Sequence, residues 1–375
     1  MKKSKKQIFI FNQYYYPAFK AGGPIKSIKL IKDKLDEKFL ISIFTSSFDI
    51  DNKKVFRSKK KVKGINHFDN FFSFIFFLFK NYFIKKLDNT LYFNSFFNFK
   101  YTIFPLVFFK FFTFKNTIIL APRGELFDSE LKKKFLKKVI YLLFFKIFLQ
   151  DKIIFHATSI DEKKVIKKIF FKNKIKLLPN LVEEKIENNL KFQKISYPLK
   201  FIYFSRISQK KNLLETLSIL SKVKFPIVLD IYGPIENNHY WEKIRLKIME
   251  LMKKKKKLVV KYKGLINHDK YKIINKYNFF ILLSDSENFG HAIFESILSK
   301  CIPIITKNSP WKKFEKFNCG LFLDIKDKFA QKKIEFFIKS VQKNPKKIHY
   351  KLDQIVKTIY QEQSKINYEK LFINI

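Results

Sequence analysis

Short apolar runs of strand length alternate along this chain with longer segments that have helical spacing. Continuous apolar runs of this kind are typical of strands buried in a parallel sheet. Because parallel strands need long crossover connections, usually helices, the alternation predicts an α/β fold with doubly wound sheets. We expect strands at residues 7–12, 40–45, 117–120, 152–158, 200–204, 227–232, 258–262, 279–283 and 302–305.

The alternation pauses after Leu178-Pro179-Asn180, and a polar linker follows before the strands resume near residue 200. Two series of strands on either side of a linker predict two doubly wound domains that face each other across a cleft. We place these domains at residues 1–190 and 191–355. Residues 356–375 are expected to form a C-terminal helix that packs back on the first domain.

The charge of the chain allows three interpretations. Its 77 basic residues give a net charge of +45, which suits nucleic acid, an anionic membrane or a biased composition. Arginine occurs only at residues 57, 123, 206 and 245, whereas lysine and phenylalanine abound, as in a chain encoded by AT-rich DNA. Arginine and the eight glycines therefore stand out as residues with a specific task.

Neither membrane-spanning segments nor a disulfide framework is expected. The longest apolar runs are interrupted by lysine and fall short of the roughly 20 residues that a spanning helix needs. The start of the chain lacks the pattern of a signal peptide, so we expect a cytoplasmic protein. The two cysteines, Cys301 and Cys319, are expected to be small buried residues.

Of two carboxylates eight residues apart, Glu287 precedes a helix that is expected to begin at Gly290, and Glu295 lies inside that helix. The N-terminus of a helix offers unpaired N–H groups and suits a diphosphate, while carboxylates accept hydrogen bonds from sugar hydroxyls. A capping Glu287 and a surface Glu295 are the alternative. A second signal, Arg206 with Lys211, follows a predicted strand. Fixed cations there would stabilise a departing diphosphate, unless both are simply solvated.

These motifs resemble those of the retaining glycosyltransferases of family 4, which have the GT-B fold of two facing Rossmann-like domains. Arg206 and Lys211 match the R-x4-K motif of that family, and Glu287 and Glu295 match its E-x7-E motif. The turn at residues 178–180, the loop from Tyr16 to Gly23 and the strand at 301–305 also resemble family segments. The resemblance extends through nearly the whole chain.

The resemblance implies a role for each matching position. Arg206, Lys211 and Glu287 would carry the catalysis by holding the donor diphosphate and the donor sugar. The other donor-binding positions would be Gly22, Gly23, Arg123, Gly264, Leu265, Asn288, Phe289, Gly290 and Glu295. Such enzymes transfer a sugar from a UDP- or GDP-sugar to a glycan or lipid-linked acceptor and require no metal or other cofactor.

Four features depart from the family or remain ambiguous. Asn212 stands where the family often has glycine, a mild change because asparagine tolerates the left-handed conformation. Arg123 stands where many members carry histidine, and it either contacts the donor sugar or an acidic acceptor, or orients its own loop. His156 is expected to be a satisfied core residue. Asp49 and Asp51 have the D-x-D form of a different, metal-dependent class, but their polar loop favours solvated acids.

The segment from Ser129 to Leu149 is expected to form one helix with both lysines and apolar residues. Its lysines include residues 132, 133, 134, 137 and 138, and its apolar positions include residues 131, 135, 139 and 142. Such a helix either binds an anionic membrane surface or packs its apolar face on the sheet.

The sequence therefore favours a GT-B glycosyltransferase of cell-envelope polysaccharide or lipopolysaccharide synthesis, cytoplasmic or peripheral on the inner face of the membrane. A basic nucleic-acid-binding protein and a non-catalytic GT-B scaffold are the alternatives. Nucleic acid is not an expected partner, because no nucleic-acid-binding module is recognisable.

Overall fold

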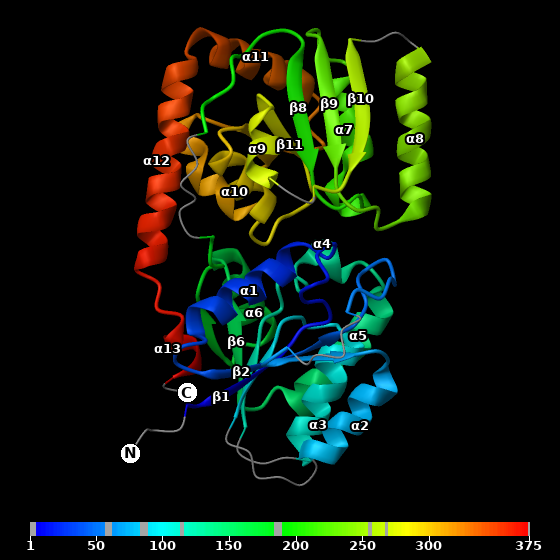
Figure 1. Ribbon diagram of the computed structural model, residues 1–375, viewed down its shortest axis with the longest axis vertical. Coiled ribbons are helices and arrows are strands. Elements are labelled where there is room, and N and C mark those ends of the chain that lie inside the picture. The colour runs from blue at the N-terminus through cyan, green and yellow to red at the C-terminus, as the bar shows by residue number, and fades with distance from the viewer. Residues whose placement is uncertain are drawn as a thin grey trace. The chain divides into compact units, whose positions relative to one another are not determined.

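The computed structural model describes residues 5–56, 62–82, 89–112, 116–183, 190–253, 257–266 and 269–373. It divides into two compact units (Figure 1). Unit 1 comprises residues 1–183 and 366–375, and unit 2 comprises residues 184–365.

Unit 1 is built on a seven-stranded parallel sheet with the order β3-β2-β1-β4-β5-β6-β7. Its strands are β1 (Gln7–Phe11), β2 (Leu40–Ser46), β3 (Ile65–Phe68), β4 (Thr90–Phe93), β5 (Thr117–Leu120), β6 (Ile153–Ala157) and β7 (Lys174–Leu177). Its helices are α1 (Gly23–Leu35), α2 (Phe71–Tyr82), α3 (Phe104–Phe112), α4 (Asp128–Leu131), α5 (Phe135–Phe144), α6 (Ile160–Ile169) and α13 (Glu369–Phe372). Two π-helical segments, Phe99–Ile103 and Phe145–Leu149, adjoin α3 and α5.

Alternating strand residues of unit 1 separate into two apolar cores. Phe9 and Phe11 of β1 belong to the core that includes residues of α2, α3 and α6. Ile8 and Ile10 belong to the other core, which α1 and α13 cover (Figure 1). Because helices cover both faces of the sheet, the inner strands β1, β4, β5 and β6 are almost entirely apolar, as the sequence pattern predicts for buried parallel strands.

Unit 2 is built on a six-stranded parallel sheet with the order β10-β9-β8-β11-β12-β13. Its strands are β8 (Leu199–Phe204), β9 (Ile227–Tyr232), β10 (Leu258–Gly264), β11 (Phe279–Leu282), β12 (Ile302–Thr306) and β13 (Leu321–Leu323). Its α-helices are α7 (Leu213–Leu220), α8 (Asn238–Lys253), α9 (Lys270–Asn275), α10 (His291–Leu298), α11 (Ala330–Lys343) and α12 (Pro345–Ser364). Short 3-10 helices span Gln209–Lys211 and Pro310–Phe317.

The predicted α/β class with two doubly wound parallel sheets is confirmed, although the boundaries differ. The units divide after Glu183 and after Lys365 rather than after residues 190 and 355. Helix α12 continues to Ser364 because its apolar stripe, which includes Leu352 and Ile355, runs on to Ile359. Only the following segment, with α13, belongs to unit 1.

The expected single helix from Ser129 to Leu149 is wrong. Helix α4 ends at Leu131, and Lys134 adopts the left-handed conformation with a φ of 53° before α5 begins. A left-handed residue cannot continue a right-handed helix, so the segment breaks there. The chain then continues from α5 into a π-helical segment.

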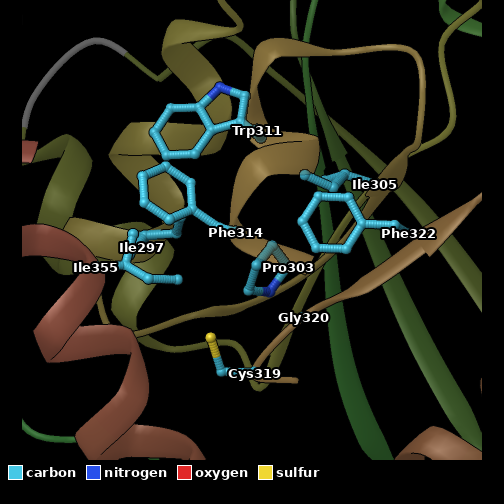
Figure 2. A pocket seen from close by; sticks show the side chains of 9 residues that line it. All are labelled: Ile297, Pro303, Ile305, Trp311, Phe314, Cys319, Gly320, Phe322 and Ile355. Carbon is cyan, nitrogen blue, oxygen red and sulfur yellow. The ribbon is translucent and has the colours of Figure 1, made fainter. Parts of the chain in front are cut away.

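Both cysteines are buried, as predicted, and carry free thiols. Cys319 lies beside a small apolar pocket whose lining includes Ile297, Trp311, Phe314 and Ile355 (Figure 2). This pocket belongs to the core behind α10, because nearly all of its lining is apolar. Within the described ranges, no helix is both long and apolar enough to cross a membrane.

Candidate functional site

The strand order in the sheet of unit 2 reverses between β8 and β11. The chain moves outward from β8 to β9 and β10, and then returns to β11 on the other side of β8. In open α/β sheets, ligands bind beyond the carboxyl ends of the strands at this switch point. The loops after β8 and β11 meet there: the Asp285 N–H donates to the Lys210 carbonyl oxygen at 2.9 Å. The two sequence motifs therefore lie on adjoining loops.

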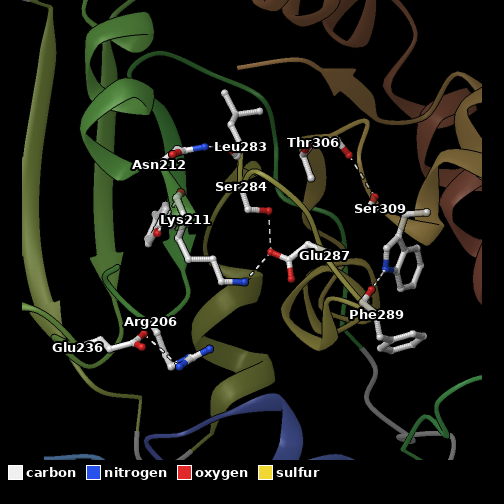
Figure 3. A network of polar contacts seen from close by, with 12 residues as sticks. Arg206, Lys211, Asn212, Glu236, Leu283, Ser284, Glu287, Phe289, Thr306 and Ser309 are labelled. Atoms are coloured by element: carbon white, nitrogen blue, oxygen red, sulfur yellow. Dashed lines mark hydrogen bonds and ion pairs between the residues drawn. The ribbon is translucent and has the colours of Figure 1, made fainter. Parts of the chain in front are cut away.

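Lys211 and Glu287 form a buried ion pair at this place. The Lys211 Nζ lies 2.6 Å from Glu287 Oε1, and their side chains are 11% and 8% exposed. The Ser284 hydroxyl donates to the same carboxylate oxygen at 2.7 Å (Figure 3). The motif spacing thus brings together two residues that lie 76 positions apart.

The pair is held in its charged form. Burial pushes the pKa of Glu287 upward, but the charge of Lys211 and the hydrogen bonds from Lys211 and Ser284 outweigh it, so the pKa lies below its ordinary value. Burial lowers the pKa of Lys211, and the Glu287 carboxylate opposes this effect. The site therefore presents a desolvated ammonium that is fixed by a carboxylate.

Asn212 positions Lys211. Asn212 has a φ of 50° and joins the short 3-10 helix to α7. Its side-chain amide donates to the Leu283 carbonyl oxygen at 3.0 Å and to Asp285 Oδ1 at 2.8 Å. Asn212 thus adopts the left-handed conformation, which asparagine tolerates, and its side chain ties the β8 loop to the β11 loop.

Arg206 follows β8 directly. Its guanidinium makes an ion pair of 3.1 Å with Glu236, and its side chain is 32% exposed (Figure 3). The Glu236 N–H donates to the Ile207 carbonyl oxygen, which places this acid beside the arginine. The charge of Arg206 also contributes to the lowered pKa of Lys211, so the two cations share one electrostatic environment.

Gly290 lets the chain turn from the β11 loop into α10. It caps this helix with a φ of 78°. A Cβ at this position would lie 2.7 Å from Ile293 Cδ1 and 3.6 Å from Glu287 Cγ. Glu295 lies in α10, where its side chain is 6% exposed and pairs with Lys270 of α9 at 2.8 Å. Glu295 is thus a buried, paired carboxylate rather than a surface residue.

The segment after β12 holds the loop that contains Glu287, and sequence reasoning missed it. The Asn308 carbonyl oxygen accepts the Glu287 N–H at 2.9 Å. The Asn308 amide donates to the Asp285 carbonyl oxygen at 3.1 Å, and the Trp311 indole N–H donates to the Phe289 carbonyl oxygen. One signal could have indicated them: they follow β12, the neighbour of β11 in the sheet, so they lie at the same edge of the sheet as the loop after β11.

Gly264 ends β10 of the same sheet, and Leu265 follows it. Gly264 has a φ of 76°, and its carbonyl oxygen accepts the Gly233 N–H at 2.8 Å. Nothing lies within 4 Å of a Cβ built on Gly264, and Leu265 is half-buried. The backbone here is open to an approaching group.

The remaining predicted donor-binding residues lie in unit 1. Gly22 precedes α1 with a φ of 74°, Gly23 begins the helix, and no atom lies within 4 Å of a Cβ built on Gly22. The structure describes each of these residues within unit 1 alone, so their role toward the residues of unit 2 stays a prediction.

Arg123 is the centre of a polar network in unit 1. It follows β5 with a φ of 54°. Its guanidinium donates to Asn94 Oδ1 and Asn180 Oδ1, each at 2.6 Å, and to the Tyr92 hydroxyl oxygen at 2.8 Å. The Tyr92 hydroxyl in turn lies 2.8 Å from Nδ1 of the fully buried His156. This geometry favours Arg123 as an organiser of its loop, and a contact with the donor stays a prediction.

The D-x-D sequence does not form a solvated acidic loop. Asp49 is only 1% exposed, and its carboxylate accepts the N–H groups of Phe19 and Lys20 at 3.0 and 3.1 Å. Asp51 pairs with the Lys20 side chain at 2.5 Å. The prediction of solvated acids is therefore wrong for Asp49, which fixes the loop before α1. In the part of the chain that the structure describes, no group of three or more His, Cys, Asp or Glu side chains is placed to hold a metal ion.

Part of the chain is similar to a known protein family. Residues 184–354 match the family described as Glycosyl transferases group 1. This match covers nearly all of unit 2, including both sequence motifs. A search of curated proteins found no match.

Solved structures show the fold of the whole chain. It is similar to HepE of Anabaena, solved with UDP-glucose, with a TM-score of 0.68, 14% identity, and 96% of this chain and 98% of that one covered. Sucrose-phosphate synthase of Thermosynechococcus elongatus gives a TM-score of 0.67 at 14% identity, with 98% and 99% covered. WaaG, a glycosyltransferase involved in lipopolysaccharide biosynthesis, gives a TM-score of 0.62 at 10% identity. The match covers 92% of this chain and 95% of WaaG. The chain has the GT-B fold, and residues 184–354 within it match the model of the glycosyl transferases group 1 family.

Proposed function

We propose that this protein is a retaining glycosyltransferase that moves a sugar from a UDP- or GDP-sugar to a glycan or lipid-linked acceptor. The observation that carries the proposal is the buried Lys211–Glu287 pair at the β8/β11 switch point, with Arg206 beside it. A charged pair costs much desolvation free energy in a protein interior, so its burial at a ligand-binding edge favours a functional role. The UDP-glucose complex of HepE favours UDP as the nucleotide.

In this proposal the cations act on the leaving group. Negative charge develops on the nucleoside diphosphate as its bond to the sugar breaks. The ammonium of Lys211 and the guanidinium of Arg206 stabilise that charge from fixed positions and need no reorganisation during the reaction. This arrangement would let the reaction proceed without a metal ion or other cofactor, because the side chains supply the positive charge.

The carboxylates and backbone of the same loops bind the rest of the donor. Glu287 orients Lys211 and contacts the sugar, and the backbone from Asn288 to Gly290 lines the sugar pocket. Glu295 accepts hydrogen bonds from the ribose hydroxyls, while Gly264 and Leu265 lie against the base. We propose that Gly22, Gly23 and Arg123 of unit 1 also bind the donor.

Transfer with retention places the acceptor hydroxyl on the face of the sugar from which the diphosphate leaves. The similarity of the fold to WaaG favours an acceptor of envelope polysaccharide or lipopolysaccharide synthesis. A cytoplasmic location, peripheral on the inner face of the membrane, completes the proposal.

The test measures release of nucleoside diphosphate from a panel of UDP- and GDP-sugars. Wild-type protein should turn over at least one donor, and Lys211→Met should lower kcat by about 100-fold or more. Lys247→Met is the matched control, because Lys247 makes a similar ion pair with Glu250 on the surface of α8. Equal turnover by wild type and Lys211→Met, or none with any donor, would contradict the proposal and favour the scaffold or nucleic-acid alternatives.

A further inference from the structure

Helix α5 and the π-helical segment after it expose an unusual number of large apolar side chains. The structure buries no residue of α5. Leu136, Ile140 and Ile147 are 74%, 66% and 71% exposed. The other exposed apolar residues of this stretch are Phe135, Leu143, Phe144 and Phe148. An apolar surface of this kind is rare on a soluble protein unless something covers it.

Packing on the sheet does not explain these apolar residues. The residues of the same stretch that pack on the sheet lie on its opposite side. Tyr141 and Leu142 pack against the core, and Phe145 and Leu149 are fully buried. The stretch therefore has two apolar sides. The inner side packs into the core of unit 1, and the outer side is exposed.

The neighbouring helices extend this outer surface. Phe72 and Phe76 of α2 are 81% and 69% exposed, and Phe111 of α3 is 55% exposed. Rings of α2 and α3 are in contact, and the Lys110 Nζ of α3 donates to the Leu149 carbonyl oxygen at 3.3 Å. The three helices thus lie in one layer on one side of the sheet (Figure 1). We name their exposed apolar residues the outer apolar layer: Phe72, Phe76, Phe111, Phe135, Leu136, Ile140, Leu143, Phe144, Ile147 and Phe148.

Positive charge borders this layer. Lys132, Lys133, Lys134 and Lys137 are exposed at the start of α5, and Lys146 is exposed further along. Few acids lie among them: Glu130 pairs with Lys133 at 3.2 Å. Apolar side chains with lysines at their border match a surface that is apolar beneath an anionic layer of headgroups.

The charge also decides between partners. Two copies of this chain that met through the layer would bring lysines against lysines in a protein of net charge +45. Opposed like charges disfavour such an interface. An anionic membrane instead places negative charge opposite every lysine.

We propose that the outer apolar layer docks on an anionic lipid bilayer, with its aromatic and aliphatic side chains inserted at the level of the headgroups. This inference rests on the proposed function in one respect: a protein docked on the bilayer would meet a lipid-linked acceptor there. The layer lies wholly within unit 1, whereas the Lys211–Glu287 site lies in unit 2, so the two proposals can fail separately.

The experiment is sedimentation of the full chain with vesicles of phosphatidylcholine containing phosphatidylglycerol, beside vesicles of phosphatidylcholine alone. We expect at least tenfold stronger partitioning to the anionic vesicles. Leu136→Ser, Ile140→Ser and Ile147→Ser combined should weaken it at least tenfold, because three inserted side chains are lost. The matched control combines Leu246→Ser and Met249→Ser, which change exposed apolar residues of α8 in unit 2 and should leave partitioning unchanged.

Each other outcome contradicts the proposal. Binding that both sets of variants leave intact would show general attraction of lysines to anionic lipid. Loss of binding in the α8 control would place the contact in unit 2. Self-association without vesicles that the three α5 substitutions abolish would make a second copy the partner. UDP binding measured on the same variants reports on the donor site, so its loss or absence bears on the proposed function alone.

Discussion

Acidification should destabilise unit 1 through His156. This side chain is fully buried, and its Nε2 donates to the Leu178 carbonyl oxygen at 2.9 Å. A carbonyl only accepts, so Nε2 carries the proton and Nδ1 accepts the Tyr92 hydroxyl hydrogen. The ring is therefore neutral. Burial and the nearby charge of Arg123 lower its pKa from 6.5 to about 3.

The magnitude follows from proton linkage. Near pH 7.5 the ring is neutral in both the folded and the unfolded chain. Between the two pKa values, only the unfolded chain binds the proton. The free energy of unfolding therefore decreases as the pH is lowered through this range. From pH 7.5 to pH 5 the loss is about 2 kcal/mol, since each pKa unit corresponds to about 1.4 kcal/mol.

Urea unfolding of wild type and His156→Gln at these two pH values, monitored by circular dichroism, tests this prediction. Glutamine keeps an N–H donor for the Leu178 carbonyl oxygen but does not titrate. The free energy of unfolding of wild type should fall by about 2 kcal/mol more than that of the variant. The same pH dependence in both proteins would refute a neutral, buried His156.

Three further predictions concern unit 2. Trp311→Phe keeps a ring but removes the N–H that holds the Phe289 carbonyl oxygen, so we expect a KM for the donor raised about tenfold by the loss of one hydrogen bond, with little change in melting temperature. Gly290→Ala should weaken donor binding measured by calorimetry, because alanine is strained at the φ of 78° that the turn into α10 requires. Lys211→Met should lower the free energy of urea unfolding by about 3–5 kcal/mol by leaving Glu287 charged and buried, and adding Glu287→Gln should restore most of it.

Most strands were predictable because a buried parallel strand is a short continuous apolar run. The strands β11 and β12 follow this rule and lie where the pattern places them. The edge strand β7 was missed because its four residues are partly exposed and carry two lysines. The strand β4 was missed because phenylalanine fills α2 and α3 as well, so apolar content no longer distinguishes strand from helix.

The candidate site was predictable where a spacing had a chemical meaning. The two motifs indicated Lys211 and Glu287, and the structure brings these two side chains together. Hydrogen bonds to backbone groups have no characteristic residue spacing. The contacts of Asn308 and Trp311 with the β11 loop are of this kind, so no motif indicated them. The exposed outer side of α5 was also not predictable, because the same apolar residues suit packing on a sheet.

The central claim is that the loops after β8 and β11 form a nucleotide-sugar site. Its most direct test is calorimetric titration of the purified chain with UDP, GDP and ADP, beside Arg206→Ala and Glu295→Ala. Arg245→Ala is the matched control, because Arg245 pairs with Glu242 on the exposed surface of α8. We predict saturable binding of one nucleotide, weakened at least tenfold by both site variants and unchanged in the control. Equal binding by all four proteins, or none by wild type, would contradict the account.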